Sequence, residues 1–152
     1  MNSKLTGFEL EFMNMFTDIA PLWKDALTEQ IKHSQLSRDN HFSAYCLLID
    51  VDQNVTPINT KYSVPVEIII GCADYAGGTR YQLDDKVLII NPDTLIVNDP
   101  DAFSVLFHFR GGFLYEMEVF NLAGNELNIS RTKWLQRIFF TRIPDQLNMN
   151  RS

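Results

Sequence analysis

Apolar positions recur with two different periods along the chain, and the period changes near Ser34. Before it, apolar side chains fall three or four residues apart, the spacing of one face of a helix. The residues on this stripe are Leu5, Phe8, Phe12, Met15, Phe16 and Ile19, followed by Trp23, Leu27 and Ile31. Pro21 separates the two groups and suits the first turn of a second helix, which we expect to end near His33. The pattern predicts a pair of amphipathic helices.

After Ser34 the apolar residues are grouped in short runs rich in β-branched and aromatic side chains, which predicts strands. The predicted strands are Phe42–Val51, Val64–Cys72, Val87–Ile90, Leu95–Val97 and the two flanks of Gly111-Gly112. We expect Asp74–Asp85 to be a long exposed loop or a tapered hairpin. No long helical pattern separates the strands, so the sheet should be mainly antiparallel.

The last apolar segment, Ser130–Ile143, has its apolar side chains at helical spacing among basic ones, and Pro144 follows it. We expect a C-terminal amphipathic helix, although Ile138–Thr141 is also compatible with a strand. The sequence therefore predicts an α+β fold with a helix pair packed on a mainly antiparallel sheet. No linker, repeat or low-complexity stretch divides residues 1–152, so we expect a single domain.

The hairpin at Gly111-Gly112 admits two registers, which differ in the side chains that share a face. A two-residue loop would place Phe107 opposite Glu116 and mix apolar with acidic side chains. A three-residue loop that includes Arg110 pairs Phe107 with Tyr115 and gives one wholly apolar face. We favour the three-residue loop, which predicts that Phe107 and Tyr115 are buried. The opposite face would carry Ser104, Leu106, His108, Leu114, Glu116 and Glu118.

The net charge of −6 is divided unevenly along the chain. Residues 1–129 hold 8 Lys and Arg against 18 Asp and Glu, whereas residues 130–152 hold 5 against 1. A body with a net charge of −10 repels nucleic acid and attracts basic surfaces. We therefore expect a basic protein partner and no nucleic-acid partner.

Location and redox state follow from three further features. No apolar run approaches the ~20 residues that a membrane-spanning helix needs, so we expect no membrane partner. The chain begins with polar residues and reaches Glu9 and Glu11 without an apolar signal core, which favours the cytoplasm. Cys46 and Cys72 lie in apolar runs, so we expect buried, unpaired thiols.

The sequence carries no recognised motif for catalysis or cofactor binding. Gly77-Gly78-Thr79-Arg80 lacks the Lys of a phosphate loop, and the run from Asp50 has Val55 where a calcium loop requires Gly. His33, His41 and His108 show no metal-ligand spacing with the cysteines. We therefore expect no enzymatic activity, no metal and no cofactor.

A docking face on the hairpin is the remaining candidate site. Glu116 and Glu118 leave the same face of one strand, with His108 diagonally across from them. Two carboxylates and a histidine can do acid–base chemistry, but this mixture beside Leu side chains is more typical of a protein interface. We expect Asp84 and Asp85, beside Tyr81, to assist in binding the partner.

The same hairpin resembles a segment of a known family. Phe109–Phe120, followed by Gly124, is similar to part of small bacterial immunity proteins that accompany polymorphic toxins, including contact-dependent growth inhibition systems. In them, a Gly turn precedes a strand in which Glu alternates with aliphatic residues. The resemblance implies a stoichiometric inhibitor that neutralises a cognate toxin, expected to be a basic nuclease domain, by occlusion. The alternatives are an intracellular adaptor, or a small ligand-binding protein or enzyme with an unrecognised site.

Overall fold

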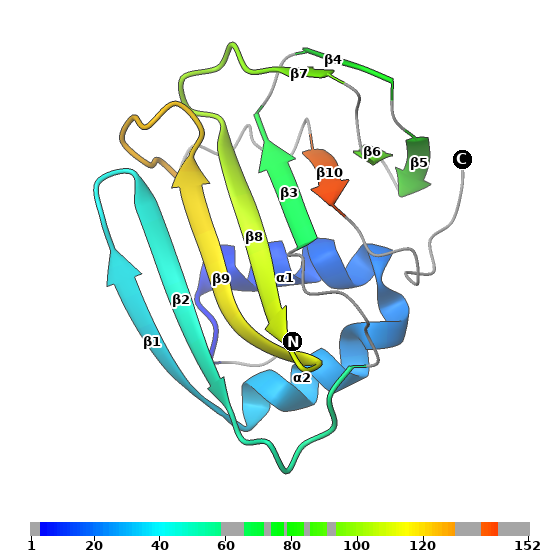
Figure 1. Cartoon of the computed structure of the whole chain (residues 1–152), viewed down its shortest axis with the longest axis vertical. Helices are drawn as coiled ribbons and strands as arrows, with labels where there is room; N and C mark the ends of the chain where they lie inside the picture. The colour runs from blue at the N-terminus through cyan, green and yellow to red at the C-terminus, as the bar shows by residue number, and fades with distance from the viewer. Residues whose placement is uncertain are drawn as a thin grey trace.

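In a computed structural model of the chain, the described residues are 4–58, 66–71, 74–77, 79–83, 86–90, 94–129 and 138–142. Two helices lie against one face of a sheet whose strands are mainly antiparallel (Figure 1). The predicted α+β class is therefore confirmed. Within the described ranges, none of the helices has the length and apolar character needed to cross a membrane.

The helix layer begins at a capping box and changes direction at a proline. Thr6 precedes α1 (Gly7–Ile19), and its backbone N–H donates to Glu9 Oε1 at 2.8 Å, which satisfies a donor at the helix start. Pro21 then opens a 3-10 turn, η1 (Pro21–Trp23), that leads directly into α2 (Lys24–Lys32). The predicted pair of helices divided at Pro21 is confirmed.

The described strands form an eight-stranded sheet in the order β1-β2-β9-β8-β3-β10-β6-β5, and β4 pairs separately with β7. Every pair is antiparallel except β10 with β6. The strands are β1 (Ser34–Asn40), β2 (Ala44–Val51), β3 (Val66–Ile70), β4 (Asp74–Ala76), β5 (Thr79–Leu83), β6 (Lys86–Ile90), β7 (Thr94–Ile96), β8 (Phe103–Arg110), β9 (Phe113–Asn121) and β10 (Ile138–Arg142).

Two parts of the strand arrangement differ from expectation. β1 was not predicted because its sequence is polar, but it pairs along its length with β2 and forms an edge, where polar side chains are tolerated on both faces. The segment Asp74–Asp85, expected to be a loop or a hairpin, contains β4 and β5. These two strands do not pair with each other, since β4 pairs with β7 and β5 with β6.

The C-terminal segment also differs in the part that the structure describes. Ile138–Arg142 forms strand β10, so the helix expected over Ser130–Ile143 is not formed there, and the strand alternative applies. β10 lies between β3 and β6, and both neighbours pair with its backbone. Hydrogen bonding on both sides favours an extended conformation over a helix. The other residues of this segment lie outside the described residues.

Aromatic side chains join the helix layer to β8. Three ring pairs span this boundary: Phe12 with Phe103, Phe16 with Phe107 and Trp23 with Phe109, with centroids 5.7, 4.8 and 5.8 Å apart. All six side chains are buried, and each pair adds to the hydrophobic stabilisation of the core. We call the face of the sheet turned away from the helices the outer face. On β2, β8 and β9 it carries Cys46, Leu48, Leu106, His108, Glu116 and Glu118.

The register of the β8–β9 hairpin corrects the prediction. The loop has two residues, Gly111 and Gly112, and not the predicted three. A β-bulge at Tyr115 adds one residue to β9, so that Phe107 lies opposite Met117 instead of Tyr115. The bulge restores the separation of apolar and polar faces that a regular two-residue hairpin would lose.

The bulge exchanges the environments of two neighbouring residues. Leu114, predicted to lie on the outer face, is fully buried in the core. Tyr115, predicted to be buried, is half-buried on the outer face, where its ring centroid lies 5.8 Å from that of His108. The expected burial of Phe107 is confirmed.

The Gly111-Gly112 turn is fixed from α2 and from the loop after β2. Gln30, fully buried, donates from Nε2 to the Gly112 carbonyl at 3.0 Å and accepts at Oε1 from the Leu114 N–H at 3.0 Å. The Ile58 N–H donates to the same Gly112 carbonyl at 2.8 Å. Gly112 has a φ of +83°, and a Cβ there would lie 2.4 Å from the Ile58 carbonyl oxygen. Only glycine fits this position without movement of the backbone.

The close contact between Gly112 and Ile58 predicts that alanine at Gly111 and alanine at Gly112 lower the stability by different amounts. Gly111 also has a positive φ, of +59°, but a Cβ there would meet nothing within 4 Å. Gly111→Ala should therefore cost only the backbone strain of about 1–2 kcal/mol. Gly112→Ala should cost a further ~1–3 kcal/mol from the steric clash, measured as the free energy of unfolding in urea. Equal losses at the two positions would contradict the close contact with Ile58.

The bulge predicts which of two neighbours supports the core. Leu114→Ala should lower the free energy of unfolding by ~2–5 kcal/mol, because it leaves a cavity in the buried face. Tyr115→Ala should cost about 1 kcal/mol, because the side chain is half-buried on the outer face. A larger loss at Tyr115 than at Leu114 would instead support the three-residue loop.

Candidate functional site

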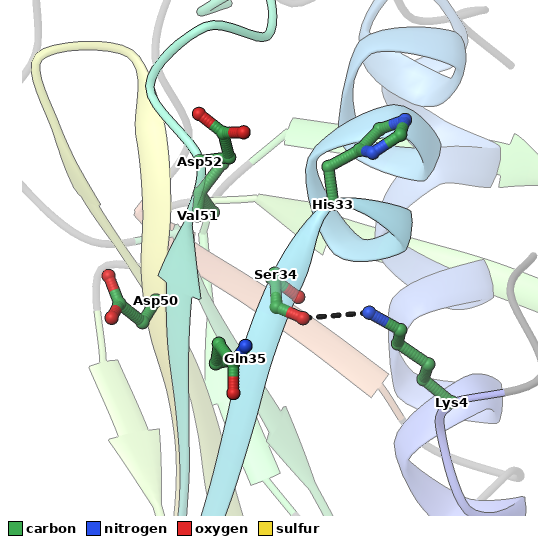
Figure 2. A pocket seen from close by; sticks show the side chains of 7 residues that line it. All are labelled: Lys4, His33, Ser34, Gln35, Asp50, Val51 and Asp52. Carbon is green, nitrogen blue, oxygen red and sulfur yellow. Dashed lines mark hydrogen bonds between the residues drawn. The ribbon is translucent and has the colours of Figure 1, made fainter.

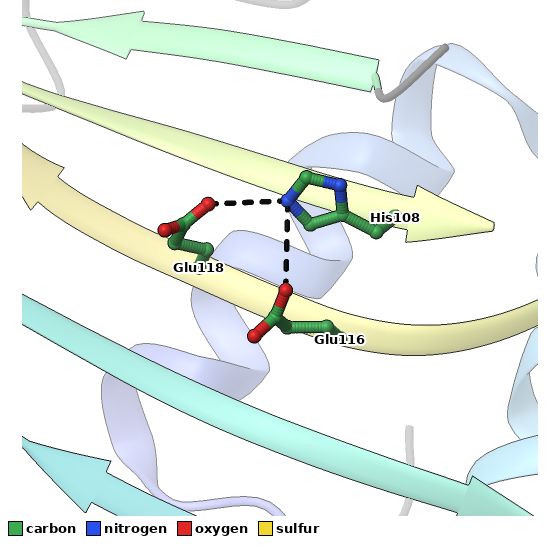
Figure 3. Close-up of side chains that lie close together, drawn as sticks. All are labelled: His108, Glu116 and Glu118. Atoms are coloured by element: carbon green, nitrogen blue, oxygen red, sulfur yellow. Dashed lines mark hydrogen bonds and ion pairs between the residues drawn. The ribbon is translucent and has the colours of Figure 1, made fainter. Parts of the chain in front are cut away.

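The outer face of the hairpin brings together three of the predicted site residues, His108, Glu116 and Glu118, which we call the triad. His108 on β8 lies opposite Glu116 on β9, and Glu118 lies two residues further along the same face. His108 Nε2 is 3.2 Å from Glu118 Oε1 and 3.7 Å from Glu116 Oε1 (Figure 3). The side chain of His108 is 21% exposed, that of Glu116 23% and that of Glu118 36%, so the triad is partly shielded from water.

Within the part of the chain that the structure describes, positive charge is scarce around the triad. In the described part of the chain, no Lys or Arg nitrogen comes within 4.0 Å of either carboxylate. Arg110, on the same strand as His108, lies over the Tyr115 ring, with its guanidinium carbon 4.7 Å from the centroid. This cation–π contact holds Arg110 beside an aromatic face. His108 is therefore the basic side chain that contacts both carboxylates.

Cys46 reaches the same face from β2, where it lies opposite Glu118. It is a free thiol, as predicted, but the expected burial in the core is wrong, because the alternation of β2 turns Cys46 away from the helices and leaves it half-buried. Burial raises the pKa of the Cys46 thiol, and the carboxylates of Glu116 and Glu118 raise it further. The thiol is thus kept protonated and lacks the activation of a catalytic nucleophile. Cys72 lies outside the described residues.

Of the other predicted site residues, only Tyr81 lies within the described part of the chain. Asp84 and Asp85 lie outside the described residues. Tyr81 belongs to β5 at the far edge of the sheet, separated from β8 by β3, β10 and β6. Three intervening strands, each ~4.8 Å from the next along the sheet, keep the β5 backbone from being a neighbour of β8. A contribution of this segment to binding stays a prediction.

A second polar cluster, missed at the level of sequence, joins α1 to the sheet. Glu9 is fully buried and accepts hydrogen bonds from Arg38 Nε and Nη2, both at 2.9 Å, and from the Tyr45 hydroxyl. Burial alone would raise the pKa of Glu9, but the hydrogen bonds from Arg38, the Thr6 backbone and Tyr45 outweigh it and lower this pKa. The signal available in the sequence was the Thr6-x-x-Glu9 capping box. Both carboxylate oxygens are used, so we assign the cluster to stability.

An open hollow lies where the start of β1 and the end of β2 meet the N-terminal segment (Figure 2). Its lining residues are Lys4, His33, Ser34, Gln35, Asp50, Val51 and Asp52. Lys4 Nζ donates to the Ser34 carbonyl at 2.7 Å. The carboxylates of Asp50 and Asp52 point away from the Lys4 amine (Figure 2). The charged groups do not converge on one point, so the hollow lacks a feature that ligand sites share.

Comparisons with known proteins do not identify a functional site, so the candidate site is chosen from the geometry of the chain. A scan against protein-family models and searches of curated proteins and of solved structures found no match. The triad is the place where the described residues gather predicted site residues at interacting distances.

The lowered pKa of Glu9 predicts a pH-dependent effect of its removal. At pH 7, Glu9→Gln should reduce the free energy of unfolding by on the order of 2 kcal/mol, because Arg38 loses its buried, charged partner. In the wild type this stabilisation is present above the ordinary pKa of 4.5 and is lost as the pH falls through the lower pKa of the folded state. Urea unfolding should therefore show the difference narrowing below pH 4.5.

Glu11→Gln provides the control for this experiment, because Glu11 lies on the same helix and is exposed. It should change the free energy of unfolding by no more than about 0.5 kcal/mol at either pH. A Glu9→Gln effect that stays constant with pH would contradict the role of the ionised carboxylate.

Proposed function

We propose that this protein is a stoichiometric inhibitor, an immunity protein that binds a cognate toxin domain through the outer face of its sheet. The observation that carries the proposal is the pair of carboxylates, Glu116 and Glu118, which β9 directs to that face. Among the described residues their ion-pair partner is one histidine, so they keep negative charge available to a basic partner.

The outer face has the mixed composition of a protein interface. Its acidic side chains on β2, β3 and β9 are Asp50, Glu67, Glu116 and Glu118. Apolar side chains lie among them: Leu48 is 46% exposed, and Leu106 and Phe120 are partly exposed. Helices α1 and α2 cover the opposite face (Figure 1). Apolar anchors supply the area that a partner buries, and the carboxylates orient it and reject acidic competitors.

Charge complementarity favours a basic partner. The net charge of −10 over residues 1–129 would accelerate the approach of a positively charged domain and make the rate sensitive to salt. A nuclease domain carries a basic surface because its substrate is a polyanion. An acidic protein that covers this surface would inhibit the toxin by occlusion, without chemistry of its own.

The resemblance of Phe109–Phe120 to a segment of immunity proteins supports the same proposal. That segment forms the turn and most of β9, including both carboxylates of the triad. An inhibitor of this kind acts where its toxin would act, so a cytoplasmic location belongs to the proposal. We expect no enzymatic activity from the chain.

The test begins by co-expressing this chain with the product of the gene next to its own and recovering the complex by co-purification. The rate of association of the two proteins is then measured by stopped-flow kinetics at low and high salt. The double variant Glu116→Lys/Glu118→Lys should associate at least about tenfold more slowly at low salt, and its rate should depend less on salt. A basic protein partner and a one-to-one complex are the expected results.

The matched control is Glu11→Lys/Asp18→Lys, which changes the net charge equally at two exposed positions of α1. Its association rate should stay within about threefold of the wild type, since only long-range attraction is altered. Equal slowing by both double variants would show that the outer face is not the docking surface. Failure to recover any basic partner would overturn the inhibitor proposal itself.

A further inference from the structure

Two carboxylates in the triad converge on a single ring nitrogen. Glu116 Oε1 and Glu118 Oε1 both approach His108 Nε2, as the two dashed lines in Figure 3 show. One nitrogen carries at most one proton, and that proton points to one acceptor at a time. At any moment, therefore, one of the two half-buried carboxylates has no hydrogen bond from His108 Nε2.

We propose that His108, Glu116 and Glu118 bind a divalent first-row transition-metal ion of the Zn²⁺ type. In a tetrahedral site with metal–ligand bonds of ~2.0–2.1 Å, neighbouring ligand atoms lie ~3.3–3.4 Å apart. The nitrogen here lies 3.2 and 3.7 Å from the two oxygens, and all three ligand atoms lie within 4.8 Å of one another. Small rotations of the glutamate side chains would complete a three-ligand site.

The donor set selects the class of ion. Two carboxylates neutralise a divalent charge, and one neutral imidazole nitrogen favours Zn²⁺ and its neighbours over Mg²⁺ or Ca²⁺, which prefer oxygen ligands throughout. Cys46 lies close by but does not belong to the group of converging ligand atoms. Three ligands on the partly exposed outer face would leave a fourth position to which water can bind.

The strands hold the ligands in place before any ion binds. His108 and Glu116 are paired across β8 and β9, and the inner-face neighbours Phe107 and Met117 are fully buried. Ligands fixed by a packed sheet lose little conformational entropy on binding. The inference rests on this geometry and not on the proposed function, because an ion would bind to the isolated chain.

Calorimetric titration of the full chain with ZnCl₂ at pH 7, after removal of metal with a chelator, tests the proposal. We expect one equivalent of Zn²⁺ to bind, and His108→Gln and Glu118→Gln each to weaken the Kd at least about tenfold. His41→Gln is the matched control, because exposed His41 lies 3.0 Å from a single carboxylate, that of Asp39. Its Kd should stay within about twofold of the wild type.

Co²⁺ in place of Zn²⁺ gives a second readout, since its visible absorption reports the number and type of ligands. A tetrahedral spectrum without a thiolate charge-transfer band is expected, whereas such a band would place Cys46 in the site and overturn the proposed ligand set.

Displacement of Zn²⁺ by millimolar Mg²⁺ would overturn the choice of ion. Circular dichroism checks the fold of each variant, and Glu116→Gln replaces any that is unfolded. No saturable Zn²⁺ binding, or equal binding by the triad variants, would refute the site.

Discussion

Successive residues of a strand point to opposite faces, and β9 has to satisfy this constraint while starting from the two-residue turn at Gly111 and Gly112. Without an extra residue, Phe107 would face Glu116, and the carboxylates would be directed into the helix layer. The bulge at Tyr115 shifts the pairing by one, so that Met117 meets Phe107 in the core. The aromatic contacts with the helices and the triad on the outer face both depend on this one inserted residue.

Buried polar contacts then fix the helix layer at two places. The side-chain amide of Gln30 ties α2 to the hairpin turn by hydrogen bonds to Gly112 and Leu114. The Glu9 carboxylate ties the start of α1 to Arg38 on β1 and Tyr45 on β2. Such groups are costly to bury unless they are paired, so they favour one placement of the helices over alternatives of similar hydrophobic burial. Ring contacts between the helices and β8 fill the space between these anchors.

The two proposals for the outer face concern the same atoms and therefore constrain each other. A divalent cation at the triad would cancel the charges of Glu116 and Glu118, which the proposed docking of a basic protein uses. Occupancy by a cation and attraction of a basic partner would then oppose each other. A partner that itself supplied the fourth ligand would reverse this relation, because the ion would bridge the two proteins. Under these two proposals, the binding of an ion at the triad would determine the charge of the outer face.

Local patterns in the sequence are enough to predict the helix pair, the division at Pro21, the antiparallel strands and the presence of His108, Glu116 and Glu118 on one face. Each follows from spacing within a short segment, where periods of 3.6 and 2 act directly. Contacts made only in the folded chain produce the bulge at Tyr115, the polar strand β1, the strand at Ile138–Arg142 and the Glu9–Arg38–Tyr45 cluster. These features depend on residues that are distant in sequence. A neighbouring strand can hold a polar segment in an extended conformation, and a buried charge is tolerated only where the fold brings an oppositely charged partner next to it.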